Sequence, residues 1–303
     1  YPNGHTSAAD IDTTTKLVSK SETAKVYDDF MFSNLVKGIS YKLTGTLHKR
    51  DKNGKDLGVL EDSKGNAISK TITFTIDADG KINANGAESA TVTSSTEETV
   101  SGTIRVLFTV DSTLLEGITT TAFETVSIED YDILVHANID DKDQQVHFMK
   151  LETDLVSDKT GTNVAALVRE DIVKYTLTFE KVPYGSTVVF NGTMMDKDSK
   201  SELITNGNKV TGTVTLTVDN NGNVSTSSGV QAEVTGTKDS KTNTVSGTIV
   251  LTYKYDSSEL RNKTLVSFVT ATTNEKTVAV HDKYDDARET IYYPDIHTNA
   301  NDI

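Results

Sequence analysis

Apolar and polar residues alternate along most of the chain, and many of the apolar positions carry β-branched side chains. The segment TITFTIDADGKI, residues 71–82, alternates cleanly and then reaches an Asp-Ala-Asp-Gly turn. The segment TVTLTVDNNGNV, residues 213–224, does the same. A period of two places every second side chain on one face of an extended strand, so both segments predict β-hairpins with one apolar face.

Other segments with β-branched or aromatic residues predict further strands at 25–41 (one or two strands), 42–48, 99–110, 120–128, 132–139 and 168–179. The last of these has spacings compatible with a helix, but its counterpart earlier in the chain favours a strand. Residues 50–67 are rich in glycine and charge and predict a hairpin or loop. Many short strands at such spacing predict an all-β fold, a β-sandwich with Greek-key connections, with a barrel as the less favoured alternative.

The pattern occurs twice along the chain. TVSGTI at 99–104 returns at 244–249, and the opening YPNGHTSAADI is matched by the closing YPDIHTNANDI. The repeat unit is therefore about 146 residues, and the parent protein is expected to be a tandem array. We expect tandem Ig-like β-sandwich domains at 1–147 and 148–292, with 293–303 beginning a third repeat. The junction has no run of Gly, Pro or Ser, which favours a semi-rigid rod whose partners are neighbouring repeats of the same chain.

Composition narrows the possible functions. The formal charge of −14 argues against nucleic acid or an anionic membrane as a partner. Without cysteine the chain has no disulfide, thiolate nucleophile or zinc–thiolate site. Its apolar runs are too short to span a bilayer, and it begins without a signal-peptide pattern, as an excised segment does. Abundant Thr, Val, Ser and Gly suit an extracellular all-β protein, and we expect a monomer.

Candidate chemistry gathers in VHANIDDKDQQV, residues 135–146, and the same frame returns as VHDKYDDARETI, residues 280–291. His136 and Gln144 are an even number of residues apart and can face one side of a sheet. Thr6 lies at the start of the repeat, and the first and last strands of Ig-like sandwiches commonly lie side by side.

These residues suggest an intramolecular acyl transfer. A threonine hydroxyl such as that of Thr6 is a poor nucleophile unless a neighbouring base, here His136, takes its proton. Glu124 would be either the carboxylate that orients the imidazolium or a protonated acid that polarises the amide. Attack on the Gln144 carboxamide would expel ammonia and leave a Thr–Gln ester between the terminal strands.

The order T…GTL…(V/A)FE…HxxxxDxxQ resembles the ester-bond (T-Q) domains of Gram-positive surface adhesins, with Phe123 and Glu124 in the Phe-Glu motif. The resemblance covers both repeats. It implies a cell-wall-anchored extracellular stalk of Ig-like sandwiches, whose tip domain outside this segment binds a host ligand. It also implies that Thr6 is the nucleophile, Gln144 the electrophile, and His136 and Glu124 the assisting pair.

The family pattern has an aspartate just after the GTL strand. The second copy keeps it as Asp196, whereas the first copy has Lys49. Asp51 lies two residues further on, on the same face if the strand continues, and is expected to substitute.

The second copy departs from the pattern at its reacting residues. Thr153 aligns with Thr6 and His281 with His136, but Val269 replaces Glu124 and Glu289 replaces Gln144. An ionised carboxylate is a bad acyl acceptor, so condensation would require burial to keep Glu289 protonated, with loss of water. We expect no ester in this degenerate copy.

Other classes of function stay open on the sequence. A carbohydrate- or host-matrix-binding adhesin module is the main alternative, although the chain has no tryptophan and only scattered tyrosines. A hydrolase using Thr6, His136 and Glu124 would need an open cleft. Asp140, Asp141 and Asp143 suit a solvated acidic turn better than a calcium site, and no cofactor or metal is expected.

Overall fold

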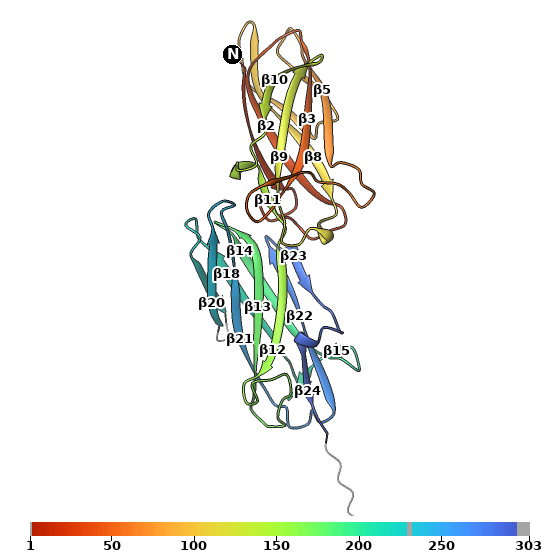
Figure 1. Cartoon of the computed structure of the whole chain (residues 1–303), viewed down its shortest axis with the longest axis vertical. Coiled ribbons are helices and arrows are strands. Elements are labelled where there is room, and N and C mark those ends of the chain that lie inside the picture. Colours follow the sequence, from red (N-terminus) through yellow and green to blue (C-terminus); the bar gives the residue numbers. More distant parts are fainter. Residues whose placement is uncertain (1, 229–231, 296–303) are drawn as a thin grey trace, which may run out of the picture.

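The computed structural model describes residues 2–228 and 232–295. Within them the chain forms two β-sandwiches stacked end to end along the long axis of the molecule (Figure 1). The described residues contain three short 3-10 turns but no α-helix, and none of their helical segments is long and apolar enough to cross a membrane. The all-β prediction is confirmed. Most of the third-repeat prediction, from residue 296 onward, lies outside the described residues.

Each sheet of the first sandwich is antiparallel. One sheet has the order β1 (Asn3–Asp10), β2 (Ala24–Val36), β8 (Thr99–Val110) and β7 (Ser89–Ser95). The facing sheet has the order β10 (Tyr131–His136), β9 (Thr119–Ile128), β3 (Ser40–Arg50), β5 (Ser69–Ile76) and β6 (Ile82–Asn85). Two short strands extend it, β4 (Asp56–Val59) on β3 and β11 (Gln145–His147) on β9.

The second sandwich repeats this topology. Its first sheet has the order β12 (Lys150–Ser157), β13 (Asp171–Pro183), β21 (Thr244–Tyr255) and β20 (Ala232–Asp239). Its second has β19 (Val224–Ser228), β18 (Thr211–Val218), β14 (Thr187–Asp196), β22 (Lys263–Thr273) and β23 (Lys276–His281). Three short additions complete it: β15 (Ser201–Glu202) on β14, β24 (Thr290–Tyr293) on β22, and the hairpin of β16 (Ile204–Thr205) and β17 (Asn208–Lys209).

The strands that the alternating pattern predicts are present in the structure. Residues 71–82 form β5 and the start of β6, and the backbone N–H of Gly80 closes the predicted turn on the carbonyl of Asp77 at 3.0 Å. The segment predicted as one or two strands at 25–41 is β2 and the first residues of β3, separated at Gly38, whose φ of 77° suits glycine. The segment at 168–179 enters a strand at Asp171, as predicted.

The repeated TVSGTI motif has a steric reason. A Cβ atom on Gly102 of β8 would lie 2.4 Å from the carbonyl oxygen of Thr91 on β7. At the equivalent place in the second sandwich, a Cβ on Gly247 would lie 2.0 Å from the carbonyl oxygen of Thr235. Both positions therefore need glycine for close strand approach.

The first and last strands of the first sandwich lie next to each other, as expected, but they belong to different sheets. β1 pairs with β2, whereas β11 pairs with β9 of the facing sheet. The chain beyond β1 returns beside β11, where Leu17 and His147 form a parallel bridge. β1 contacts β11 and β9 across the open edge of the sandwich. A bond between β1 and the start of β11 would therefore join the two sheets to each other.

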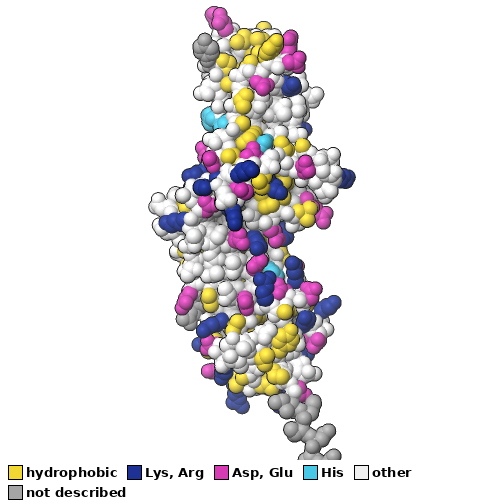
Figure 2. Space-filling model, in the orientation of Figure 1, with side chains coloured by type: hydrophobic (Ala, Val, Ile, Leu, Met, Phe, Trp, Pro, Cys, Tyr) yellow, Lys and Arg dark blue, Asp and Glu magenta, His cyan; other side chains and the backbone are white. Residues whose placement is uncertain are grey.

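The joint between the two sandwiches is short, and residues of both sandwiches form contacts across it. Only Phe148 and Met149 separate β11 from β12, and Met149 and Leu17 are buried in the core of the second sandwich. Across the joint, the backbone N–H of Lys20 donates to the carbonyl of Thr277 at 2.7 Å, and Asn274 Nδ2 donates to the carbonyl of Thr13 at 2.8 Å. Figure 2 shows acidic and basic side chains together around this middle part of the molecule. These contacts support the expectation of a semi-rigid rod.

Candidate functional site

Three of the predicted residues meet inside the first sandwich. Thr6 on β1, Glu124 on β9 and Gln144 before β11 are each at most 2% exposed. Gln144 Nε2 donates a hydrogen bond to Glu124 Oε2 at 2.9 Å. Thr6 lies beside the same carboxyl group and lowers its pKa slightly, although Thr6 Oγ1 forms no hydrogen bond of good geometry within the described residues. A hydroxyl, a carboxyl and an amide group are thus held together away from water.

A capped turn aims Gln144 into the sandwich. The 3-10 turn η2 (Lys142–Gln144) begins at Asp141, whose side chain accepts the backbone N–H of Asp143 at 3.0 Å. The backbone N–H of Gln144 then donates to the carbonyl of Asp141 at 3.2 Å. Aspartate is a favoured cap because its carboxylate satisfies a backbone donor that the turn leaves free. The Asp-x-x-Gln spacing therefore orients the amide.

His136 lies opposite Glu124 in the register of β10 and β9. Its Nε2, however, is 2.8 Å from Asp141 Oδ2, so Asp141 is the carboxylate that orients this imidazole. His136 Nδ1 is buried without a hydrogen-bond partner among the described residues. His136 and Glu124 therefore lie opposite each other as neighbours, and Asp141, not Glu124, is the carboxylate that contacts the imidazole.

Asp28 on β2 belongs to the site but was not among the predicted residues. It is completely buried, and burial raises its pKa. Burial, and then the negative charge of Asp28, raise the pKa of Glu124 well above its usual range. Two carboxyl groups so close do not ionise together, and we assign the proton to Glu124, which shares it with Asp28.

The sequence did contain a signal for Asp28. Val26, Phe30 and Phe32 are buried on the inner face of β2, and Asp28 occupies the same phase of the alternation. A carboxyl group on an otherwise apolar strand face is costly unless it is protonated or paired, so such a position indicates a functional group.

Lys16 supplies a positive charge near the buried residues Thr6, Asp28, Glu124 and Gln144. Its ammonium donates to the carbonyl of Ala8 at 2.5 Å and to the carbonyl of Asp143. Burial lowers the pKa of Lys16, while Asp143 and Asp28 oppose that shift. The positive charge favours an ionised Asp28.

The structure does not place Asp51 with these residues. The strand ends at Arg50, and Asp51 Oδ1 instead accepts the backbone N–H groups of Asn53 and Lys55, at 2.8 and 2.7 Å. Those bonds, Lys55 first, lower the pKa of the exposed Asp51 carboxyl. The expectation that Asp51 supplies the missing acid is wrong because a turn, not a continued strand, follows β3. Asp28 is the acid that lies there.

Asp196 likewise stays outside the site of the second sandwich. It ends β14, where it accepts Lys263 Nζ at 2.7 Å and the backbone N–H of Asp198 at 3.0 Å.

The positions of the second sandwich that are equivalent to Thr6 and Gln144 are also buried, but the side chains around them differ. Thr153 on β12 is 2% exposed and Glu289, at the end of the turn η3 (Ala287–Glu289), is fully buried. Val269 is buried where the first copy has Glu124, and Tyr175 takes the place of Asp28 on β13. The acid pair of the first copy is thus replaced by an apolar and a phenolic side chain.

Burial raises the pKa of Glu289 to about 9. The carboxyl group is therefore protonated, which is the condition stated above for condensation with Thr153. His281 Nε2 lies 3.2 Å from Glu289 Oε2 and 3.3 Å from Asp286 Oδ2. Val269 occupies the place from which Glu124 accepts the amide of Gln144 in the first copy, so that contact is lost.

The fold and the first site together define a β-sandwich repeat with a buried threonine, acid and glutamine between its first and last strands. The chain belongs to the family of T-Q ester bond containing domains, whose model matches residues 2–148 and 149–293. Among curated proteins, no sequence matches the chain.

Solved structures with a related arrangement include a bacterial adhesin from Mobiluncus mulieris containing intramolecular disulfide, isopeptide and ester bond cross-links. It is 14% identical, covers 82% of this chain and 92% of its own, and has a TM-score of 0.34. The C-terminal domain of the AgI/II polypeptide BspA from Streptococcus agalactiae is 8% identical, with coverages of 92% and 98% and a TM-score of 0.39.

Proposed function

We propose that the first sandwich cross-links itself through an ester between Thr6 Oγ1 and the side-chain carbonyl carbon of Gln144, with release of ammonia. The observation that carries this proposal is the buried hydrogen bond of 2.9 Å from Gln144 Nε2 to Glu124 Oε2, next to Thr6. A protonated Glu124 is in contact with the nitrogen that must leave.

The proton balance is simple. Thr6 Oγ1 attacks the Gln144 carbonyl carbon, and its proton passes to the Asp28–Glu124 pair, which holds one proton between two carboxyl groups. Glu124 gives a proton to the leaving nitrogen, so that ammonia departs and the pair ends as it began. His136, held by Asp141, is the second group able to accept the hydroxyl proton.

The fold supplies the remaining catalysis. Thr6 and Gln144 lie on elements that the sandwich itself brings into contact, so the reaction is unimolecular. Burial also excludes water, which would otherwise hydrolyse the product. Each chain reacts once, and we propose a self-cross-linking protein rather than an enzyme with turnover. A hydrolase would need substrate access, and the buried Thr6 does not offer it.

The cross-link suits a load-bearing stalk. Because β1 and β11 belong to opposite sheets, an ester near their ends would carry tension between the sheets without loading the ladder hydrogen bonds. We propose that the chain is an extracellular stalk segment of a bacterial cell-surface adhesin, anchored to the cell wall. A tip domain outside this segment would bind the host ligand. The second sandwich would serve as an uncross-linked repeat.

Intact mass of the purified chain tests the proposal. We expect a mass lower than the sequence mass by one ammonia, and full mass for Thr6→Ala. The matched variant Thr153→Ala, at the equivalent place of the second sandwich, should keep the ammonia deficit. Full mass in the unaltered chain, or a deficit that Thr153→Ala removes, would overturn the assignment to the first sandwich.

A further inference from the structure

The degenerate site of the second sandwich contains a compact group of three metal-ligating side chains. His281, Asp286 and Glu289 each place one ligand atom within 4.8 Å of the other two. His281 ends β23 and Glu289 ends the turn that Asp286 caps, so the cluster is held by the fold and not by a mobile side chain alone.

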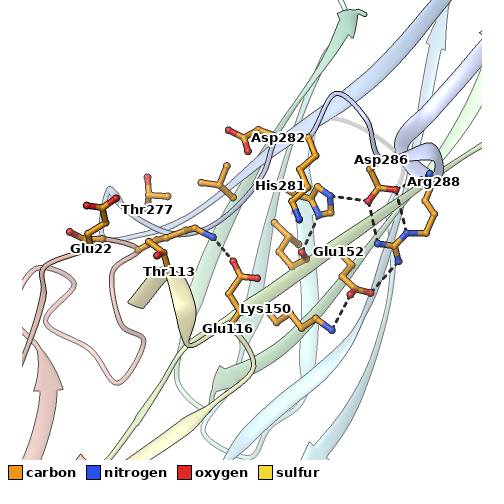
Figure 3. Close-up of a pocket in the computed structure, with 15 residues that line it drawn as sticks. Glu22, Thr113, Glu116, Lys150, Glu152, Thr277, His281, Asp282, Asp286 and Arg288 are labelled. Atoms are coloured by element: carbon orange, nitrogen blue, oxygen red, sulfur yellow. Dashed lines mark hydrogen bonds and ion pairs between the residues drawn. The ribbon is translucent and has the colours of Figure 1, made fainter. Parts of the chain in front are cut away.

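This cluster borders a pocket of about 550 Å³ between the two sandwiches. Figure 3 shows His281 and Asp286 on one wall, with Glu116 and Thr113 of the first sandwich on the other side. Glu289 lies behind them and is fully buried. A small solute therefore has a path from solvent to the two outer ligands.

The buried atoms of the cluster lack ordinary partners. Both carboxyl oxygens of Glu289 and Nε2 of His281 are buried without a well-formed hydrogen bond among the described residues. Buried polar atoms are normally satisfied. Here His281 Nε2 has only ion-pair approaches of 3.2 Å to Glu289 Oε2 and 3.3 Å to Asp286 Oδ2, and Glu289 Oε1 has no partner among the described residues. Together these atoms indicate a missing ligand.

The histidine is oriented as a metal ligand is. His281 Nδ1 lies 3.2 Å from the carbonyl oxygen of Leu151, an acceptor that requires the proton on Nδ1. This fixes the tautomer and directs the Nε2 lone pair toward Asp286 and Glu289. A second-shell carbonyl on the other ring nitrogen is the usual arrangement for histidine ligands.

The two spacings from His281 to the carboxylates also fit a tetrahedral ion. Two ligands that each lie about 2.0–2.1 Å from zinc at the tetrahedral angle are about 3.3 Å apart. His281 Nε2 is 3.3 Å from Asp286 Oδ2 and 3.2 Å from Glu289 Oε2.

We propose that His281, Asp286 and Glu289 bind one divalent transition-metal ion of the zinc class, with the fourth position directed to the pocket between the sandwiches. One imidazole and two carboxylates are a donor set that such ions accept. The positive charge of the ion would neutralise the two acidic side chains.

Arg288 is the main competitor for this position. Its backbone N–H donates to Asp286 Oδ1 at 2.9 Å, and its Nη2 donates to Asp286 Oδ2 at 3.3 Å. The guanidinium is about half exposed and also contacts Glu152 at 3.4 Å, so it can leave Asp286 Oδ2 without losing every partner (Figure 3). The cap made by Asp286 Oδ1 stays in place.

The first sandwich supplies an internal comparison. It keeps the histidine and the capping aspartate as His136 and Asp141, which lie 2.8 Å apart. The third position is Gln144. Its amide is neutral and already donates a hydrogen bond to Glu124. The change from Gln144 to Glu289 thus removes an ester-forming amide and adds an anionic ligand at the same place.

Equilibrium dialysis of the full chain against Zn²⁺, after removal of metals with a chelator, tests the proposal. We expect one zinc ion per chain. His281→Ala and Glu289→Gln should each weaken binding at least about 10-fold. Asp286→Asn should also weaken it, whereas Asp285→Asn, at the exposed neighbouring position, should not. Arg288→Ala should tighten it, because a competing cation is removed.

Thermal unfolding of the same variants separates lost binding from lost folding. Zn²⁺ should raise the Tm of the unaltered chain but not that of Glu289→Gln, whose metal-free Tm should stay close to the original. Zinc uptake that is not saturable, or that is equal in Asp285→Asn and Glu289→Gln, would overturn the metal site. So would a mass deficit of one water between Thr153 and Glu289, because the ligand would then be consumed in an ester.

Discussion

Glu124 combines two properties that the reaction needs in one side chain. Burial, and then the negative charge of the neighbouring Asp28, raise the pKa of its carboxyl group well above the usual range, which favours the protonated form. It also accepts the hydrogen bond from Gln144 Nε2 at 2.9 Å, so its carboxyl group contacts the nitrogen that leaves in the proposed reaction. The proposed reaction therefore depends on the pair Asp28–Glu124 and not on Glu124 alone.

The first prediction compares the effect of removing the Asp28 carboxylate with that of removing the Asp29 carboxylate. Asp28→Asn should slow ammonia loss by about 10²-fold, the usual effect of removing one member of an acid–base pair. The matched variant Asp29→Asn loses only an ion pair with Arg105 on the outer face and should react normally. Mass measured at intervals after refolding checks both. Equal rates in the two variants would rule out a role for Asp28.

The second prediction concerns pH in the unreactive Thr6→Ala background. The pKa of Glu124 is raised in the folded state, so the folded chain holds a proton that the unfolded chain releases above its ordinary value of 4.5. This contribution to stability is full below that pH and is lost as pH rises through the higher folded value.

Denaturant unfolding across pH checks the linkage. The free energy of unfolding of Thr6→Ala should fall, relative to that of Thr6→Ala with Glu124→Gln, as pH rises above about 4.5. A constant or rising difference would show that Glu124 is not held protonated by the fold.

At the scale of elements, sequence alternation locates strands well because each strand buries one face locally. The repeat in the sequence likewise anticipates two copies of one topology, and the order of strands in the two sandwiches is the same. Asp28 could not be assigned to the site in this way, because its contact with Glu124 depends on how two sheets face each other. The prediction that Asp51 belongs to the site is wrong because β3 ends at Arg50. The Asp51 side chain instead caps the turn that follows, so the strand face does not extend to it.

The third prediction concerns the close approach of β7 and β8 at Gly102. Gly102→Ala would place a Cβ at 2.4 Å from the carbonyl oxygen of Thr91 and force the strands apart. We expect a loss of about 2 kcal/mol in the free energy of unfolding of the first sandwich. Ser101→Ala, next to it on β8, should change stability by less than about 0.5 kcal/mol. Denaturant unfolding in the Thr6→Ala background compares them, and similar values would contradict the steric account.

At the scale of the whole molecule, the joint makes the two sandwiches depend on each other. Leu17 belongs to the first repeat in sequence, yet its side chain is fully buried in the core of the second sandwich. Met149, from the junction itself, joins the same core. The chain is therefore better described as a rod with shared packing at the joint than as independent beads.

The fourth prediction tests this dependence. Leu17→Ala should destabilise the second sandwich by about 2–5 kcal/mol, because it empties part of that core. Hydrogen exchange should rise in the strands of the second sandwich, β13 and β21 included. The exposed Leu57→Ala should have no such effect. Faster exchange confined to the first sandwich would contradict shared packing at the joint.

The central claim is that one ester joins Thr6 to Gln144 and that the equivalent residues of the second sandwich stay unjoined. Tryptic peptide mapping by mass spectrometry tests it most directly, since Thr6 falls in residues 1–16 and Gln144 in residues 143–150. We predict that these two peptides appear as one linked species, lighter than their sum by one ammonia, and that alkali separates them. The peptides of Thr153 and Glu289, residues 151–159 and 289–303, should appear separately at full mass. Free, unmodified peptides 1–16 and 143–150 from the folded chain would contradict the account.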